Sequence, residues 1–179
     1  MLVHRTQLEG VLLLEPRVFA DERGYFLENF NERVFQEIGI GARFVQDNQS
    51  QSKQHVLRGL HFQVEKPQGK LIRVLRGEIF DVVVDLRPES ASYGKWAGMS
   101  LTGDRHQLLW IPTGIAHGFY VNSETADVIY KVTEFYDPGS ERTLLWNDPD
   151  LAIRWPFKGI PILSEKDRRG CKFRDLPAL

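Results

Sequence analysis

The fold of this chain follows most directly from the stretch Phe80-Asp81-Val82-Val83-Val84-Asp85-Leu86. Successive side chains of a β-strand point to opposite faces of a sheet. One face of this stretch would carry Phe80, Val82, Val84 and Leu86, and the other Asp81, Val83 and Asp85. This alternation predicts a β-strand.

Similar short β-rich runs recur along the chain, at Val11–Leu14, Leu71–Leu75, Leu108–Ile111, Phe119–Val121, Val128–Glu134 and Thr143–Trp146. Turn signals separate them, at Arg76-Gly77, Asp137-Pro138-Gly139-Ser140 and Asn147-Asp148-Pro149. Many short strands with few helices predict an all-β sandwich or barrel, and a jelly roll in particular.

One segment has a helical pattern, from Asn31 to Ile38. Asn31 would cap the helix, Val34, Phe35 and Ile38 would share a face, and Gly39 would end it. Because no repeat, linker or low-complexity block divides the 179 residues, we expect a single domain over residues 1–179.

The charge balance argues against two classes of partner. Lys and Arg total 23 and Asp and Glu total 24, so no global field favours nucleic acid or an anionic membrane. The single cysteine, Cys171, excludes an internal disulfide and favours a reducing compartment. The start of the chain does not read as a signal peptide, and Val11–Leu14 is too short to span a bilayer. We therefore expect a soluble, cytoplasmic protein.

The stretch Arg58-Gly59-Leu60-His61-Phe62-Gln63 is the strongest indication of chemistry. Leu60 and Phe62 face one way on the predicted strand, whereas Gly59, His61 and Gln63 face the other, as they would towards a pocket. A histidine titrates near neutrality and can serve as a general base. Taken alone, His61 is better explained as a hydrogen-bonded core or surface histidine, because nothing local singles out catalysis.

Three further side chains have both a catalytic and an ordinary interpretation. Lys70 opens a run in which Lys70, Ile72 and Val74 share one strand face. Its amine would either stabilise an oxyanion or extend into water. Tyr130 lies between Val128 and Val132 on a strand face, as a core tyrosine often does. Asp167 belongs to a run of charged residues that would normally be solvated.

A metal site is the main rival to a base. Pro112-Thr113-Gly114-Ile115-Ala116-His117 resembles the second motif of the cupin superfamily, whose histidine often binds a metal. The first cupin motif usually supplies His-x-His, but this chain has His61-Phe62-Gln63, and glutamine is a poor ligand for transition metals. Two histidines with a nearby lysine rarely form a zinc site, so we expect no metal. The chain also lacks a dinucleotide fingerprint and a phosphate loop.

Ten blocks, read in order, resemble the dTDP-4-dehydrorhamnose 3,5-epimerase family over nearly the whole chain. They are Glu15–Phe19, Asp21–Gly24, Phe44–Asn48, Arg58–Gln63, Gly69–Leu71, Trp110–Pro112, Ala116–Phe119, Tyr130–Lys131, Trp146–Asp148 and Leu163–Asp167. The resemblance implies a cupin-type jelly roll (double-stranded β-helix) with a few short peripheral helices. It implies epimerisation of dTDP-4-dehydro-6-deoxy-D-glucose at carbons 3 and 5, giving dTDP-4-dehydro-L-rhamnose, without metal or other cofactor.

The resemblance also implies roles for the four candidate catalytic residues. His61 would remove the protons next to the ketone, and Asp167 would fix its tautomer. Lys70 would stabilise the enolate oxygen. Tyr130 would return a proton from the opposite face of the sugar, which inverts the carbon.

The implied substrate-binding residues are Arg23, Phe26, Glu28, Gln46, Asp47, Asn48, Arg58, His117, Phe119, Glu141 and Lys166. Arg23 and Arg58 are suited to clamp diphosphate oxygens. Family members are typically homodimers, and an arm within about residues 1–50, including the Arg23 region, would reach the neighbour's pocket. The loop Val64–Gly69 is about a residue shorter than is usual in the family, and its effect on the pocket is left open.

Two alternatives remain open at the level of the sequence. Related enzymes with nearly the same motifs epimerise one carbon, as in antibiotic-sugar biosynthesis. A non-catalytic cupin that binds a sugar nucleotide is the alternative from another functional class.

Overall fold

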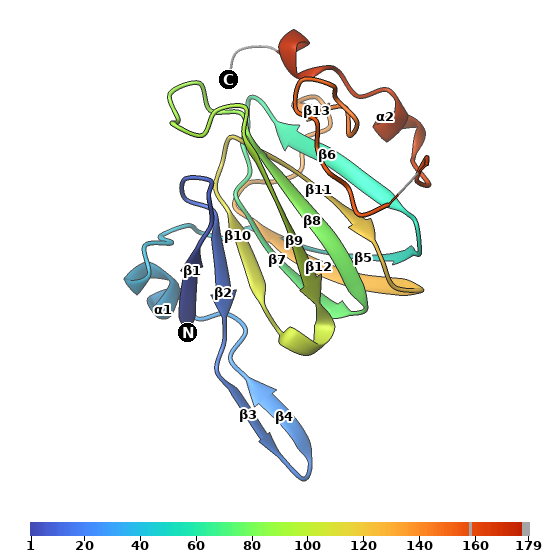
Figure 1. The fold of residues 1–179 in the computed structure, drawn as a ribbon. Helices are drawn as coiled ribbons and strands as arrows, with labels where there is room; N and C mark the ends of the chain where they lie inside the picture. Colours follow the sequence, from blue (N-terminus) through green and yellow to red (C-terminus); the bar gives the residue numbers. More distant parts are fainter. Residues whose placement is uncertain (158, 177–179) are drawn as a thin grey trace.

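Two antiparallel sheets form the body of the protein in a computed structural model that describes residues 1–157 and 159–176 (Figure 1). The six-stranded sheet has the order β1 (Leu2–Arg5), β2 (Leu12–Glu15), β10 (Leu108–Ile111), β7 (Lys70–Arg76), β12 (Thr125–Val132) and β5 (Gln46–Lys53). The five-stranded sheet has the order β13 (Glu141–Thr143), β6 (Leu57–Gln63), β11 (Ile115–Val121), β8 (Glu78–Asp85) and β9 (Trp96–Thr102).

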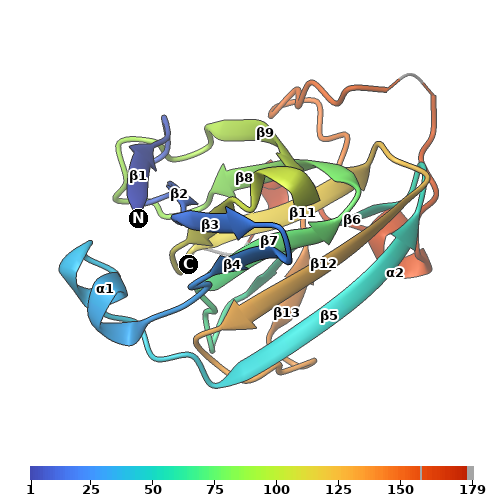
Figure 2. The ribbon, with the colours of Figure 1, turned by 90° about the horizontal axis from the view of Figure 1, so that it is seen from below.

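The chain passes back and forth between these two sheets. From β5 to β13 successive strands alternate between them, except that β8 and β9 are neighbours in the five-stranded sheet. Figure 2 shows the two layers from below, with β5 and β12 on one side and β8 and β9 on the other. This alternation of antiparallel strands is the jelly-roll arrangement, and the all-β prediction is confirmed.

The stretch that predicted the fold forms β8, inside the five-stranded sheet. Val83 packs in the core between the sheets, whereas Val82 and Val84 pack with Trp155 and Phe173 of the C-terminal segment. Both faces of the strand are therefore covered, and Asp81 is buried with them. A carboxylate buried in this way needs a protein partner.

Most predicted strands are confirmed, and the run Leu108–Ile111 forms β10 with the predicted bounds. The prediction for Thr143–Trp146 is wrong beyond its first residue, because β13 ends at Thr143. Leu144 still exchanges backbone hydrogen bonds with Leu60 of β6 and also forms an isolated bridge with Cys171. The sequence patterns missed β1, β5, β9 (Trp96–Thr102) and the two strands of a hairpin, β3 (Val18–Asp21) and β4 (Gly24–Leu27).

The predicted helix is present as α1 (Glu32–Glu37). The Asn31 side chain accepts hydrogen bonds from the backbone nitrogens of Arg33 and Val34, and Phe35 is buried. Gly39 follows with a φ of +88°, which a glycine adopts without strain. The other short helices are α2 (Glu165–Arg168), η1 (Gly103–Arg105) and η2 (Phe173–Asp175).

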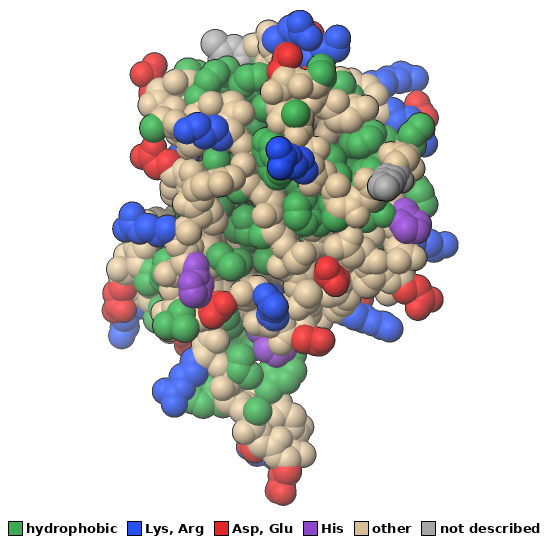
Figure 3. All heavy atoms as spheres, in the orientation of Figure 1, with side chains coloured by type: hydrophobic (Ala, Val, Ile, Leu, Met, Phe, Trp, Pro, Cys, Tyr) green, Lys and Arg blue, Asp and Glu red, His purple; other side chains and the backbone are tan. Residues whose placement is uncertain are grey.

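The hairpin β3–β4 projects from the body and exposes aromatic side chains, including Phe26, which is 70% exposed (Figure 1). On the face shown in Figure 3, acidic and basic side chains are scattered rather than gathered into one patch. Among the residues described, no helix is long and apolar enough to cross a membrane.

Candidate active site

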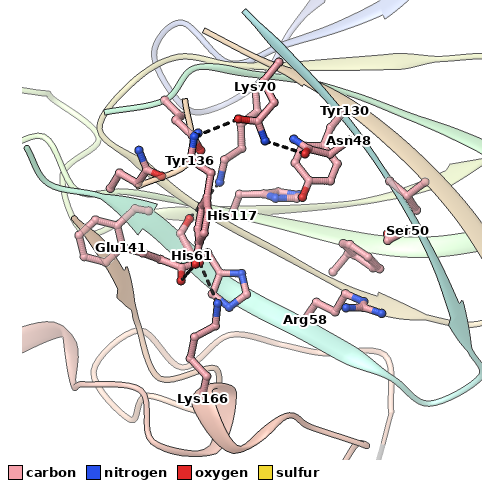
Figure 4. Close-up of a pocket in the computed structure, with 16 residues that line it drawn as sticks. Asn48, Ser50, Arg58, His61, Lys70, His117, Tyr130, Tyr136, Glu141 and Lys166 are labelled. Carbon is pink, nitrogen blue, oxygen red and sulfur yellow. Dashed lines mark hydrogen bonds and ion pairs between the residues drawn. The ribbon is translucent and has the colours of Figure 1, made fainter. Parts of the chain in front are cut away.

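A cavity of about 380 Å³ opens between the two sheets (Figure 4). Strands of both sheets, the loops beside them and α2 supply its lining. The lining residues are Gln46, Asn48, Ser50, Arg58, His61, Phe62, Gln63, Gln68, Lys70, His117, Phe119, Val128, Tyr130, Tyr136, Glu141 and Lys166.

His61 lies on the cavity wall with a carboxylate behind it. Its Nε2 is 2.6 Å from Oδ1 of Asp167, and its side chain is 25% exposed. Asp167 is only 3% exposed, so the expectation of a solvated charge run is wrong at this position. Burial opposes ionisation of Asp167, but hydrogen bonds from His61, Ser164 and the Gly59 backbone hold its pKa below the usual range. The pair has the arrangement of a general base oriented by a carboxylate.

Close contact between two strands places His61 at this wall. Gly59 has a φ of +116°, and a Cβ there would lie 2.6 Å from the Cα of Gly118 on β11. The register between β6 and β11 shifts between His117 and Phe119. Such irregularities reorient side chains near functional sites. Here the irregularity lies beside the pair His61 and His117, which face each other across the two strands.

Lys70 enters the cavity from β7 in the opposite sheet. It is only 7% exposed, so the ordinary interpretation of an amine in water is wrong. Its Nζ lies 3.3 Å from the backbone oxygen of His61 and donates a hydrogen bond to it. Burial lowers the pKa of Lys70 to about 8, against the opposing pull of Glu141 and Asp81. At pH 7 the group is therefore mainly an ammonium beside the base.

Tyr130 lies on β12, so the six-stranded sheet carries the phenol and the five-stranded sheet carries His61. Burial raises the pKa of Tyr130 above its ordinary value of 10, so the phenol keeps its proton at neutral pH. Figure 4 shows Tyr130 and His61 directed into the same space from different strands. An imidazole and a phenol therefore approach the cavity from its two walls.

A second histidine and carboxylate lie deeper. The Nε2 of His117 is 2.8 Å from Oδ2 of Asp81, and both residues are buried. Burial lowers the pKa of His117, with the nearby charge of Asp81 acting against this shift. His117 is accordingly a neutral polar group in the cavity.

A chain of hydrogen bonds runs along the rim of the cavity from α2 to β5. Lys166 Nζ is 2.8 Å from Glu141, and the Tyr136 hydroxyl donates to the other oxygen of Glu141 at 3.0 Å. The backbone nitrogen of Tyr136 donates to Gln46, whose amide donates to Asn48 at 2.8 Å. These polar groups line the cavity, and Figure 4 labels Asn48, Tyr136, Glu141 and Lys166 among them.

Arg58 lies near the edge of the same cavity on β6. Its Nε donates to the Ser52 hydroxyl at 2.8 Å, and its Nη2 lies 3.4 Å from the Gln51 backbone oxygen. These contacts fix a guanidinium, a planar group suited to bind phosphate oxygens.

Known proteins resemble this chain over nearly its whole length. Residues 5–175 match the family model described as dTDP-4-dehydrorhamnose 3,5-epimerase. The chain belongs to this family. A curated dTDP-4-dehydrorhamnose 3,5-epimerase of Methanothermobacter thermautotrophicus is 53% identical over 175 residues, covering 97% of this chain and 95% of the relative. The enzyme of the same name in Pseudomonas aeruginosa is 51% identical, covering 98% and 97%.

Solved structures agree with this family membership. A Legionella pneumophila epimerase in complex with dTDP-4-keto-L-rhamnose has a TM-score of 0.95 and 46% identity, covering 98% of this chain and 94% of that one. ChmJ of Streptomyces bikiniensis, a 3'-monoepimerase in complex with dTDP-quinovose, has a TM-score of 0.89 and 29% identity, with coverages of 96% and 87%. The epimerase jelly roll is thus shared, and the chain is an isomerase of this family.

The structure brings most of the predicted site residues together. At the cavity it places His61, Lys70, Tyr130, Gln46, Asn48, Arg58, His117, Phe119, Glu141 and Lys166, with Asp167 directly behind His61. Four predicted residues do not line it. Arg23 lies in the turn of the projecting hairpin, Phe26 lies on β4, and Glu28 follows that strand. Asp47 does not line the cavity and pairs with Lys131 at 2.8 Å.

The sequence patterns gave no role to the other members of the lining, namely Ser50, Phe62, Gln63, Gln68, Val128 and Tyr136. For Tyr136, the only signal was its position just before the predicted turn at residues 137–140. Gln63 was placed on the pocket face but given no role. It binds the backbone of Lys66, Phe135 and Asp137, and so joins the two loops beside the cavity.

The described residues contain no group of three or more His, Cys, Asp or Glu side chains arranged to hold a metal ion. Lys70 lies among the polar groups of the cavity and adds a positive charge there. This donor set does not resemble a zinc or iron site.

Proposed function

We propose that this protein converts dTDP-4-dehydro-6-deoxy-D-glucose to dTDP-4-dehydro-L-rhamnose by inverting carbons 3 and 5. The observation that carries the proposal is the position of the His61–Asp167 pair on one wall and of Tyr130 on the other. Relatives at about half sequence identity bear the name of this reaction.

The first step is proton removal next to the ketone. His61 takes the hydrogen from carbon 3 or carbon 5, and the electron pair of that C–H bond moves towards the carbonyl oxygen. Asp167 stabilises the imidazolium that results. The Lys70 ammonium stabilises the negative oxygen, an effect worth a few kcal/mol in a site sheltered from water.

The second step is proton return from the opposite face. Tyr130 donates its phenolic proton to the same carbon as the enolate collapses back to the ketone. Inversion follows because acid and base lie on different sheets. The ketone accepts the electrons, so the chemistry requires no redox cofactor or metal, and we expect activity to survive exhaustive chelation.

The nucleotide part of the substrate would contact the rim. Arg58 is suited to bind the diphosphate. Lys166 would also bind it, once its ammonium leaves Glu141 for a phosphate oxygen. Gln46, Asn48, His117, Phe119 and Glu141 would contact the remainder of the substrate from the lining.

We further propose that the protein works as a homodimer. Arg23, Phe26 and Glu28 would complete a neighbour's cavity, because the exposed hairpin β3–β4 holds two of them away from this chain's own cavity. Asp47, which pairs with Lys131 here, would also contact the substrate. We also infer that the protein acts in the cytoplasm.

Inversion of a single carbon is the second candidate, favoured by the similarity to the 3'-monoepimerase ChmJ. Incubating the enzyme with substrate in D₂O separates the possibilities. We expect solvent deuterium at both carbons 3 and 5. Label at one carbon would establish a single-centre epimerase, and label at neither would leave a binding protein.

A further inference from the structure

Ser164 makes two hydrogen bonds to a single residue, Asp167. Its Oγ accepts from the Asp167 backbone nitrogen at 3.1 Å and donates to Oδ2 of the Asp167 carboxylate at 2.7 Å. A hydroxyl has one donor and two acceptor positions, so both bonds exist at once. The first bond caps α2, and the second acts directly on the carboxylate.

The other oxygen of that carboxylate is the one that binds His61. Ser164, Asp167 and His61 therefore form a continuous hydrogen-bonded series that ends at the cavity. Because Asp167 is almost fully buried, its charge depends on protein donors rather than on bulk water. Ser164 supplies one of these donors.

The segment before Ser164 is tied to the strand that carries His61. Ile162 bridges to Val56 in parallel, and the backbone of Ile162 exchanges hydrogen bonds with His55 and Leu57 at the start of β6. The Ser164 hydroxyl and the His61 imidazole thus bind the two oxygens of the Asp167 carboxylate. The segments that carry these two groups are joined through Ile162. Ser164 itself is outside the cavity lining.

We propose that Ser164 is a positioning residue for the base, orienting the Asp167 carboxylate so that Oδ1 faces His61. The proposal rests on the proposed function, in which His61 is the base. Without the hydroxyl the carboxylate has a free oxygen and can rotate. Water that enters the vacated space would not be fixed to the protein frame, so it would replace the donor only in part.

Three substitutions separate this role from helix capping alone. Ser164→Thr keeps both the donor and the acceptor. Ser164→Ala removes both. Ser164→Asp keeps the capping acceptor but lacks the donor, and it places a second carboxylate beside Asp167.

The measurements are the pH dependence of kcat/KM and the melting temperature of each variant. The acid limb of that profile responds to the charge on Asp167. The Ser164 bond is one of those that lower the pKa of Asp167, so its loss should move the acid limb to higher pH. Glu141, Lys166, Lys70 and His117 are the charged or titratable groups near the pair, and all remain unchanged in these variants.

We expect kcat to fall roughly threefold to tenfold in Ser164→Ala, a part of the 10²–10⁴ that a general base contributes. KM should stay within about twofold, because Ser164 does not line the cavity. Ser164→Asp should show the larger shift of the acid limb, and it should melt below the wild type because its carboxylate faces the buried Asp167. Ser164→Thr should match the wild type in both measurements.

Ser123→Ala is the matched control. Ser123 also has a hydroxyl that accepts from one backbone group and donates to another, at Glu78 and Thr125. It should lose stability without moving the acid limb. Wild-type activity in Ser164→Asp, or an unchanged acid limb in both Ser164→Ala and Ser164→Asp, would overturn the proposal. Failure of the wild type to place deuterium at any carbon would instead overturn the proposed function.

Discussion

Lys70 illustrates how a single side chain is adjusted by its surroundings. A lysine that is 7% exposed loses most of its hydration, which disfavours the ammonium form. The carboxylates of Glu141 and Asp81 recover part of this loss, and the resulting pKa is about 8 instead of the ordinary 10.5. The enzyme would therefore hold a weakly hydrated cation near the ketone oxygen at neutral pH.

The first prediction concerns the alkaline limb of kcat/KM. Lys70 is an ammonium below pH about 8 and a neutral amine above it, so activity should fall as the pH rises through about 8. Tyr130 does not account for this limb, because burial raises its pKa above 10. Glu141→Gln removes a charge that supports the ammonium and should move the limb to lower pH. A flat profile up to pH 10 would contradict the role of Lys70.

Replacing the base gives the second prediction. His61→Ala should abolish deuterium incorporation at both carbons, because in the proposed mechanism one imidazole serves both proton transfers. Binding of dTDP, measured by calorimetry, should change only a few-fold, since Arg58 and the rim residues are intact. Exchange that persists at either carbon would show that another group removes that proton.

Removing the acid should have a different signature, which is the third prediction. Tyr130→Phe leaves His61 and Lys70 in place, so protons should still exchange with solvent. Without the phenol, return of a proton to the opposite face should slow by about 10²–10⁴. NMR would then show deuterium in unconverted substrate. Normal yields of inverted product would place the acid elsewhere.

At the scale of elements, the sequence predicts a strand well when its two faces differ in polarity or are both apolar. β8 and β10 satisfy this condition, and both were predicted. β5 does not, because Gln46, Asn48 and Ser50 line the cavity while the residues between them are exposed. A polar cavity thus hides one of its own walls from a pattern that relies on hydrophobic alternation.

The short helix α2 was missed for a related reason. Its sequence Ser164-Glu165-Lys166-Asp167 carries a capping signature, but the charges made a solvated run the simpler interpretation. The burial of Asp167 depends on β6, more than 100 residues earlier, and no local pattern reports such a contact. The pairing of Asp167 with His61 could be predicted only through the family resemblance.

The fourth prediction tests the contact between β6 and β11. Gly59→Ala would place a Cβ 2.6 Å from Gly118 in a backbone region that disfavours side chains. Stability should fall by more than about 1 kcal/mol, and activity should fall further because His61 is two residues away. Gly41→Ala, where a Cβ meets nothing within 4 Å, is the control. Equal melting temperatures and activities for the two variants would show that this close contact is dispensable.

At the scale of the whole molecule, the predicted all-β jelly roll is confirmed. It could be predicted because the alternation of side chains and the turn signals recur over most of the chain. These patterns do not predict where the N-terminal arm lies. The hairpin β3–β4 contains Phe19, Tyr25 and Phe26, yet all three are exposed. Their hydrophobic character indicates a surface to be covered.

The fifth prediction tests exchange of this arm between subunits. Arg23→Ala damages the arm, whereas His61→Ala damages the cavity. If each cavity uses its neighbour's arm, a mixed dimer of the two variants contains one cavity with both groups intact. Co-expression should therefore restore activity that neither variant has alone. Lack of recovery, with mixed dimers shown by native mass spectrometry, would contradict shared sites.

The placement of His61 and Tyr130 on separate sheets also constrains the order of events within one catalytic cycle. In the proposed mechanism, inversion of the first carbon leaves the imidazole with an extra proton and the phenol without one. The enzyme is then in the wrong state for the second carbon. The raised pKa of Tyr130 makes its anion a strong base that recovers a proton quickly. Water must therefore reset both groups while the half-converted sugar stays bound, and the hydrogen at each inverted carbon comes from solvent.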